Sequence, residues 1–442
     1  MEPQTVELLI HAKWVAPVVP EEAVYTDCAV AVDRGKILGL HPSGEARRRY
    51  RPHREVVLDR HILIPGLVNA HGHTPMTLLR GYADDLPLQR WLEEHIWPAE
   101  GRWVGEDFVR DGAELALAEM LKTGTTCFAD MYFFPDLVAK LAWQHGVRCQ
   151  VAFPVIDMAS AWARGIDEYI HKGLTLFDTF KDHEMVTVAF GPHAPYTVDD
   201  ATLDKIAVLA SEVEAGIQIH LHETAGEVRD ALSATGQRPI ERLRDHGLLT
   251  PATQCVHMTQ ANDTDLALLA ESGAHVIHCP RSNLKLASGF CPVHLLQEAG
   301  INVALGTDGA ASNNNLDMLE ELQFSALLAK GVSGEPTALP AARALRMATL
   351  DGARALGLDA VTGSLEAGKS ADLAAVDLGD IGCQPMYNPL SQLIYSHGSN
   401  GVSHVWVNGK SLLEDRALQT FNEHELMAKA RQWQQRIAGQ GI

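Results

Sequence analysis

The stretch AGIQIHLHET, residues 215–224, runs from apolar residues into two histidines and a glutamate. Seven further short runs rich in β-branched and apolar residues lie between residues 63 and 356, and helix-forming stretches such as GAELALAEMLKT separate them. This alternation is typical of parallel strands joined by helices. Eight runs over about 290 residues favour an α/β fold of the (β/α)₈ TIM-barrel type over an open doubly wound sheet, since such barrels usually need about 250 residues.

The two ends of the chain have a different pattern. Residues 6–64 contain strand-like runs such as VELLIHAKWVAPV and REVVLDRHILIP, and the segments SADLAAVDL and SHVWVNGKSLLE near the other end resemble them. Turn sequences such as Asp-Arg-Gly-Lys and Asn-Gly-Lys favour hairpins. We therefore expect residues 1–62 and 361–442 to form one small β-sandwich domain, with a C-terminal helix, beside a barrel of residues 63–360.

Composition limits the classes of partner. The chain has 442 residues and a formal net charge of -20, which opposes binding to nucleic acid or to an anionic membrane surface. Its seven cysteines are scattered without a CxxC pair, a pattern that indicates buried, reduced thiols and a cytoplasmic protein. Neither a signal peptide nor a run of about 20 apolar residues is evident. A small neutral or cationic substrate fits best.

Polar residues stand at the ends of several predicted strands. The first run ends in His71-Gly-His73, the fifth contains His220, and the eighth ends at Asp308. In a parallel barrel these ends share one rim, where barrel active sites lie. The two histidines at i and i+2 project to the same face of an extended strand. Three imidazoles and a carboxylate form a ligand set suited to Zn²⁺ and acceptable to Fe²⁺.

Two further rim residues are candidates for proton transfer. Glu223 follows the fifth run and His257 lies in the sixth. Each alone has an ordinary structural explanation, as a glutamate at a helix N-terminus and as a buried core histidine. Their joint position beside the predicted metal ligands favours an acid/base role. His222 points to the opposite face of the strand if the strand stays extended, so we expect it to be structural.

The segments PGLVNAHGHTPMTLLRGYADDLPLQRWLEEHIWPAE, GPHAPY, HLHET and GTDGAASNNNLDML resemble the amidohydrolase superfamily, in particular its 5'-methylthioadenosine/S-adenosylhomocysteine deaminases. The resemblance covers nearly the whole chain. It implies metal ligation by His71, His73, His220 and Asp308, and catalysis by Glu223, His257 and Asp308. It also implies substrate contacts from Glu100, His193 and Glu223. The fourth run, MVTVAFGPHAPY, lacks the lysine that bridges two metals in binuclear relatives, so one metal per chain is expected.

The resemblance implies a metal-dependent hydrolytic deaminase that converts the adenine 6-amino group of 5'-methylthioadenosine to the inosine analogue and ammonia. S-adenosylhomocysteine and adenosine are further candidate substrates, and a homodimer or homotetramer is expected. Chlorotriazine or aminotriazine hydrolysis and guanine-type base deamination are alternatives, although the retained Asp308 favours deamination. A catalytically inactive metal-binding barrel is the non-enzymatic alternative, and the presence of all six rim residues argues against it.

Two other segments need separate interpretation. GSLEAGKS, residues 363–370, satisfies the phosphate-loop pattern, but a strand-like run follows it where that motif requires a helix, so we expect a hairpin of the β-domain. The aromatic segment RWLEEHIWPAEGRW, residues 90–103, follows the first strand and should cover the rim. We expect Met76, Leu86 or Trp103 to form an apolar pocket wall there. Arg164 lies where the resemblance is loose and is left out of the site.

Overall fold

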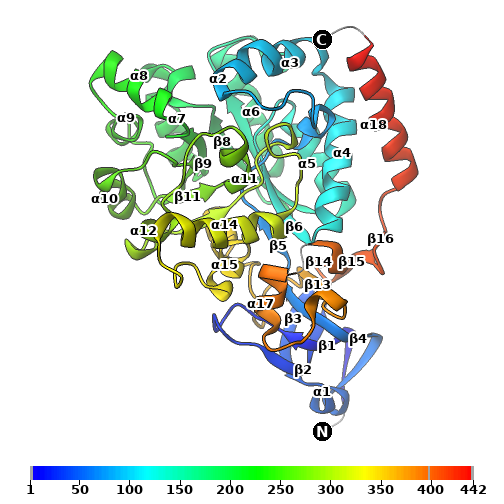
Figure 1. Ribbon diagram of the computed structural model, residues 1–442. Coiled ribbons are helices and arrows are strands. Elements are labelled where there is room, and N and C mark those ends of the chain that lie inside the picture. Colours follow the sequence, from blue (N-terminus) through cyan, green and yellow to red (C-terminus); the bar gives the residue numbers. More distant parts are fainter. Residues whose placement is uncertain (1–2, 397–398, 440–442) are drawn as a thin grey trace.

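The computed structural model describes residues 3–396 and 399–439 and contains two eight-stranded sheets. One sheet consists of parallel strands in chain order: β5 (Leu67–Asn69), β6 (Thr125–Asp130), β7 (Arg148–Val155), β8 (Val186–Pro192), β9 (Ile217–Leu221), β10 (Thr253–His257), β11 (His275–His278) and β12 (Val303–Leu305). Directly after β5, Ala70 N donates a hydrogen bond of 2.9 Å to Leu305 O in β12. This bond joins the first strand to the last, so the predicted barrel is confirmed (Figure 1).

The barrel strands are buried on both faces. Nearly every residue of β5 to β12 is inaccessible to solvent, as expected for parallel strands covered by helices outside and packed side chains inside. The connecting helices are α4 (Glu106–Lys122), α5 (Pro135–His145), α6 (Ile166–Phe180), α7 (Asp200–Glu212), α8 (Ala225–Thr235), α9 (Pro239–Asp245), α10 (Asp263–Ser272), α11 (Pro280–Lys285), α12 (Val293–Glu298), α13 (Ala310–Asn313), α14 (Met318–Ser333), α15 (Ala341–Met347) and α16 (Leu350–Ala355).

The second sheet combines the two ends of the chain. Its order is β16-β15-β14-β13-β4-β1-β2-β3. The N-terminal strands are β1 (Gln4–Val15), β2 (Tyr25–Asp33), β3 (Lys36–Pro42) and β4 (Tyr50–Pro65), and the C-terminal strands are β13 (Leu373–Asp377), β14 (Val402–Val407), β15 (Lys410–Glu414) and β16 (Ala417–Leu418). The two sets meet where β4 pairs with β13 in antiparallel fashion, with Ile64 opposite Ala374. Pairing of the two chain ends, expected from the sequence, is thus confirmed.

Short helices lie over the end of the barrel opposite the second sheet (Figure 1). They are α2 (Leu88–Arg90), a π-helical turn (Trp91–Ile96) and α3 (Trp97–Trp103). At the other end α1 (Ser43–Arg49) joins β3 to β4, and α17 (Pro389–Ser391) precedes β14. The segment after β5 therefore covers the rim, as expected from its sequence.

The last helix, α18 (Glu423–Ala438), packs against the barrel helix α4. Trp433 Nε1 donates a hydrogen bond of 2.9 Å to Asp111 Oδ2, and the Trp433 ring meets Phe108 edge to face at 5.3 Å.

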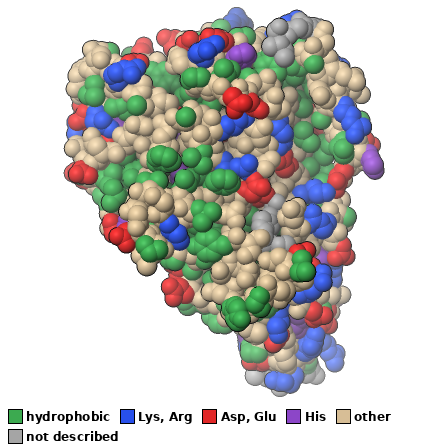
Figure 2. Space-filling view, in the orientation of Figure 1, with side chains coloured by type: hydrophobic (Ala, Val, Ile, Leu, Met, Phe, Trp, Pro, Cys, Tyr) green, Lys and Arg blue, Asp and Glu red, His purple; other side chains and the backbone are tan. Residues whose placement is uncertain are grey.

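Figure 2 shows acidic side chains among the basic ones on the face drawn. Within residues 3–396 and 399–439, no helix combines the length and apolarity that crossing a membrane requires.

Residues 363–370 do not form a phosphate loop. They make a turn that is followed by β13, where the motif would require a helix. Ser370 pairs with Lys36 at the start of β3, so the turn belongs to the β-structured end of the molecule. All seven cysteines are buried and free, in agreement with the sequence analysis.

Candidate active site

Four predicted site residues meet at one end of the barrel. His71 and His73 follow β5, His220 lies in β9 and Asp308 follows β12. The Nε2 atoms of His71 and His220 are 3.2 Å apart. Asp308 Oδ1 lies 3.6 Å from His71 Nε2 and 3.1 Å from His73 Nε2. Three imidazoles and a carboxylate therefore converge on one small volume.

The Nδ1 atoms of His73 and His220 are hydrogen-bonded to backbone carbonyl groups. His73 Nδ1 lies 2.6 Å from the carbonyl oxygen of Met131, and His220 Nδ1 lies 2.7 Å from that of His193. Because a carbonyl oxygen only accepts hydrogen bonds, both Nδ1 atoms carry a proton, and Nε2 is the nitrogen that each ring turns toward the cluster. Burial would lower the pKa of His73, but its hydrogen bond with Asp308 outweighs burial and raises that pKa to about 9, so a cation would have to displace a proton from its Nε2. Such partners orient metal-binding histidines in proteins generally.

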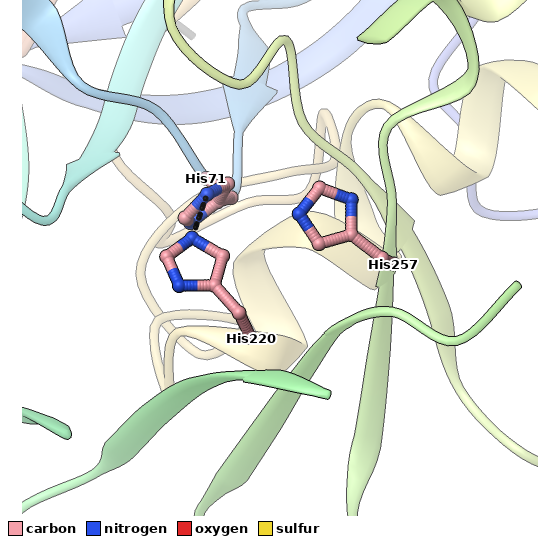
Figure 3. Close-up of side chains that lie close together, drawn as sticks. All are labelled: His71, His220 and His257. Carbon is pink, nitrogen blue, oxygen red and sulfur yellow. Dashed lines mark hydrogen bonds between the residues drawn. The ribbon is translucent and has the colours of Figure 1, made fainter. Parts of the chain in front are cut away.

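The spacing of the donor atoms fits a small divalent cation. Zn²⁺ binds imidazole nitrogen at about 2.0–2.1 Å in tetrahedral sites, which places neighbouring ligand atoms about 3.3 Å apart. Three contacts between donor atoms, His71 with His220 and Asp308 with His71 and His73, range from 3.1 to 3.6 Å. The donor atoms form two groups within 4.8 Å that share His71, one with His73 and Asp308 and one with His220 and His257. His257 belongs to the same neighbourhood, because one ligand atom each of His71, His220 and His257 lie within 4.8 Å of one another. Figure 3 shows the His257 ring beside the other two.

Asp308 is held by two hydroxyls to which the sequence analysis gave no role, although Ser312 lies in the segment GTDGAASNNNLDML. Its Oδ2 atom accepts hydrogen bonds from Ser282 Oγ at 2.6 Å and from Ser312 Oγ at 3.2 Å. Burial alone would raise the pKa of Asp308, but its hydrogen bonds with His71 and His73 outweigh burial and hold that pKa well below its ordinary value. Asp308 is therefore a carboxylate at neutral pH. Serine is too common in sequences for these two positions to have been recognised.

Glu223 and His257 adjoin this cluster with pKa values displaced in opposite directions. Burial, followed by the negative charge of Asp308, raises the pKa of Glu223 to about 8. Burial lowers the pKa of His257 below its ordinary value, and His257 Nδ1 lies 2.8 Å from Asn283 Oδ1. At neutral pH the pair is a protonated carboxyl and a neutral imidazole, which can act as proton donor and proton acceptor.

The backbone is strained at two of these positions. His257 has φ +78° and Asp308 has φ +61°, in the left-handed region that residues other than glycine seldom occupy. Strain of this kind costs on the order of 1–3 kcal/mol per residue and gathers at functional sites. A hydrogen bond of 3.1 Å from Asp308 N to His71 O helps to hold the eighth strand's end in this conformation.

Glu227 fixes the backbone that carries Glu223. Its two carboxylate oxygens accept hydrogen bonds from His222 N at 3.0 Å and from Glu223 N at 2.7 Å. On the other side, Thr259 Oγ1 donates a hydrogen bond of 2.7 Å to Glu223 O. Glu223 therefore has a bonded N–H and a bonded carbonyl, which restricts the direction of its side chain. The role of Glu227 could not be read from the sequence, where it is an ordinary first-turn glutamate of α8.

A cavity of about 220 Å³ adjoins these residues. Its wall is mainly apolar and comes from three segments, residues 88–104, 131–133 and 154–161, together with the rim residues. Among the described residues that line it, none is Lys or Arg. The cavity thus has a polar floor and an apolar wall, and the described part of its lining contains no Lys or Arg side chain.

The three residues predicted as substrate contacts, Glu100, His193 and Glu223, all line this cavity. Glu100 lies in α3 and accepts a hydrogen bond of 2.6 Å from Tyr132 Oη. Burial raises the pKa of Glu100 to about 6, and the bond from Tyr132 acts in the opposite direction. His193 follows β8, and burial, with the nearby histidines of the cluster, lowers its pKa to about 4. Tyr132 was not expected from the sequence.

The expected apolar wall is only partly correct. Met76 lines the cavity, but Leu86 and Trp103 do not. In and just after α3 the lining residues are Trp97, Glu100, Gly101 and Val104. These positions follow the i, i+3, i+4, i+7 spacing of one helical face, and position 103 falls outside that face. A tryptophan near the rim is therefore not by itself a pocket residue.

Two further residues lie outside the cavity lining: His222, as expected, and Arg164, to which the sequence analysis assigned no role. His222 is buried beneath it, where its Nε2 accepts a hydrogen bond of 3.2 Å from Ile240 N. Arg164 is exposed, and its side chain lies 3.6 Å from Glu168. The first of these positions is structural, and the second is an exposed loop residue.

The chain was compared with known proteins. Residues 62–412 match the model of the amidohydrolase family. A 5-methylthioadenosine/S-adenosylhomocysteine deaminase of Teredinibacter turnerae is 53% identical over 98% of both chains. The crystal structure of an adenosine deaminase from Xanthomonas campestris with bound zinc superposes with a TM-score of 0.98 at 49% identity, over 99% of this chain and 100% of that one.

A more distant structure shows the same fold. The zinc complex of an atrazine chlorohydrolase from Arthrobacter aurescens has a TM-score of 0.90 at 24% identity, over 96% of this chain and 99% of that one. The family model spans the barrel, every rim residue and, in the second sheet, strands β13 and β14 with parts of β4 and β15. By this match and by its similarity to the relatives above, the chain belongs to the amidohydrolase family.

Proposed function

We propose that the protein is a hydrolytic deaminase that converts the adenine 6-amino group of 5'-methylthioadenosine to the inosine analogue with release of ammonia. The observation that carries this proposal is the pair of Glu223 and His257, a protonated carboxyl beside a neutral imidazole at the floor of an apolar cavity. The names of the similar proteins from Teredinibacter turnerae and Xanthomonas campestris support the same chemistry.

The proposal includes one divalent cation per chain, Zn²⁺ or alternatively Fe²⁺, held by His71, His73, His220 and Asp308. The three imidazoles and the carboxylate suit either ion. A cation bound there supplies Lewis acidity, which lowers the pKa of water from near 16 to about 7.

The side chains then divide the proton transfers. His257 and Asp308 orient the attacking water and accept its proton. As the water oxygen adds to C6 of the adenine ring, protonated Glu223 donates its proton to a ring nitrogen and prevents negative charge from accumulating there. C6 becomes tetrahedral and carries both a hydroxyl and the amino group. Proton delivery from His257 to the amino nitrogen lets the C–N bond break and ammonia leave, while the C6 hydroxyl becomes the carbonyl of the inosine analogue and returns its proton to Glu223.

The cavity wall supports a nucleoside substrate with an apolar 5' group. A carboxylate can accept two hydrogen bonds, which suits the 2'- and 3'-hydroxyls of a ribose, and Glu100 is a half-buried carboxylate in the wall. Trp97 and Met158 line the same cavity and offer apolar surface to a thioether. A 5'-phosphate would need Arg or Lys, and the described lining contains neither.

A substrate panel tests the proposal. Turnover is measured for 5'-methylthioadenosine, S-adenosylhomocysteine, adenosine, AMP, adenine and guanine by ammonia release, and for a chlorotriazine by chloride release, with and without a chelator. We expect methylthioadenosine to have the highest kcat/KM and the chelator to abolish turnover. A highest value for guanine or the chlorotriazine would overturn the nucleoside assignment. Absence of turnover on every compound by the Zn²⁺-loaded protein would identify an inactive barrel.

A further inference from the structure

Three buried glutamines form a continuous hydrogen-bonded row inside the barrel. His71 Nδ1 lies 2.8 Å from Gln218 Oε1. Gln218 Nε2 donates to Gln254 Oε1 at 2.6 Å, and Gln254 Nε2 donates to Gln150 Oε1 at 2.9 Å. The row ends where Gln150 Nε2 donates to Leu356 O at 3.3 Å. We call Gln218, Gln254 and Gln150 the glutamine row.

The strands explain why these side chains meet. The row crosses from β9 to β10 and then to β7, and each glutamine is at most 4% exposed. Since the buried strands point alternate residues into the barrel, Gln218 shares its face with His220, two residues further along β9. A primary amide offers both a donor and an acceptor without a charge, so a row of amides can pass through an apolar core with its bonds satisfied.

The carbonyl groups that the glutamine row contacts determine which way each amide directs its NH₂ group and its oxygen. Leu356 O, at the far end, can only accept, and so can Ala70 O, which receives a second hydrogen bond of 3.1 Å from Gln218 Nε2. Gln150 and Gln218 must therefore direct their NH₂ groups toward these carbonyls. It follows that Gln218 presents its oxygen to His71. An oxygen that only accepts requires the proton on His71 Nδ1, which leaves the lone pair on Nε2.

We propose that Gln218 is a positioning residue that holds His71 in the tautomer and ring orientation needed to bind a cation, and that the glutamine row fixes Gln218. The inference rests on the proposed function only in taking His71 as a metal ligand. In His73 and His220 the Nδ1 atom is instead oriented by a hydrogen bond to a backbone carbonyl oxygen, that of Met131 and that of His193 respectively. His71 alone among the three relies on a side chain, so its orientation can be altered by a single substitution.

The proposal predicts a specific loss of metal affinity. In full-length Gln218→Leu, Zn²⁺ affinity, measured by competition with a chromophoric chelator, should fall about 10- to 100-fold, as is usual when a partner of a metal-binding histidine is removed. Gln218→Glu keeps an acceptor for His71 Nδ1 but loses the two hydrogen bonds that Gln218 Nε2 donates, so it should recover part of that affinity. Gln150→Leu, which leaves the bond to His71 in place, should have a smaller effect than Gln218→Leu.

A matched control separates positioning from stability. Gln323 Nε2 donates to Tyr395 O at 3.1 Å, and Gln323 does not line the cavity, so Gln323→Leu removes a comparable amide-to-carbonyl bond. We expect Gln323→Leu to lower the Tm of the metal-free protein without changing Zn²⁺ affinity. If Gln218→Leu does not fold, Gln254→Leu, which removes the acceptor that orients Gln218, takes its place and should also weaken Zn²⁺ binding.

Two results would overturn the proposal. One is Zn²⁺ affinity in Gln218→Leu, or in Gln254→Leu if that variant is needed, equal to that of the unmodified protein. The other is a loss of affinity that Gln218→Glu does not recover. His71→Ala is measured alongside. If His71→Ala weakens Zn²⁺ binding while Gln218→Leu does not, the positioning role of Gln218 is contradicted and the assignment of His71 as a metal ligand is retained. If His71→Ala also leaves affinity unchanged, the proposed metal site fails.

Discussion

Glu223 Oε1 lies 3.9 Å from His257 Nε2, and the two side chains come from the ends of neighbouring strands. Burial acts on both, but it raises the pKa of an acid and lowers that of a base. The contact is therefore between two neutral groups at neutral pH, and it is not an ion pair. One group has a proton to give and the other has a lone pair to receive one, which is the requirement for a reaction that both removes and delivers protons.

Glu223→Gln should retain bound metal and lose most of its turnover. The amide preserves the shape of the side chain but has no proton of suitable acidity, and proton transfer by a positioned group contributes typically about 10²- to 10⁴-fold. The measurements are metal content and kcat with methylthioadenosine. Turnover within about threefold of the unmodified protein would exclude Glu223 as the proton donor.

His71→Ala and His220→Ala should each lower metal content and activity together, because each removes one of four proposed ligands. Metal analysis of the purified variants, paired with ammonia release, measures both quantities. The control is His171→Ala, since His171 is an exposed histidine of α6 away from the cavity. Either ligand variant with full metal content and ordinary turnover would contradict the assignment.

Glu100→Ala should damage nucleoside turnover far more than metal binding, because a site built to bond a hydroxyl discriminates strongly when that bond is lost. Tyr132→Phe removes the hydrogen bond to Glu100 Oε1 and keeps the ring, so we expect a milder rise in KM. Kinetics with methylthioadenosine and metal analysis check both variants. Unchanged kcat/KM in Glu100→Ala would remove Glu100 from the substrate site.

The KM for a nucleoside should rise as the pH falls below about 6, the pKa to which burial raises Glu100. Above that pH the carboxylate is charged and accepts hydrogen bonds strongly, and below it protonation weakens the acceptor, up to about tenfold in KM per pH unit. The control substrate is 2',3'-dideoxyadenosine, which lacks both hydroxyls. An equal pH dependence of KM for this substrate would show that another group titrates.

The sequence by itself determined the elements and the residue types of the site. Eight apolar runs alternating with helix-forming stretches indicate a parallel barrel, because strands buried on both faces must be apolar along most of their length. Histidines and carboxylates at the ends of such runs indicate a shared rim, since parallel strands end on one side. His71, His73, His220 and Asp308 could therefore be grouped from local patterns, without knowledge of any contact.

Only the tertiary structure decided which ordinary residues orient that set. Gln218 and His71 are 147 positions apart, and Glu100 and Tyr132 are 32 apart. Glutamine, serine and tyrosine are common residues whose chemistry depends on the partner they meet, and a local pattern does not specify a distant partner. The turn of α3 likewise decided that Trp97 and not Trp103 lines the cavity. Local patterns place apolar and ligating residues, whereas hydrogen-bond partners and pKa values arise from packing between distant segments.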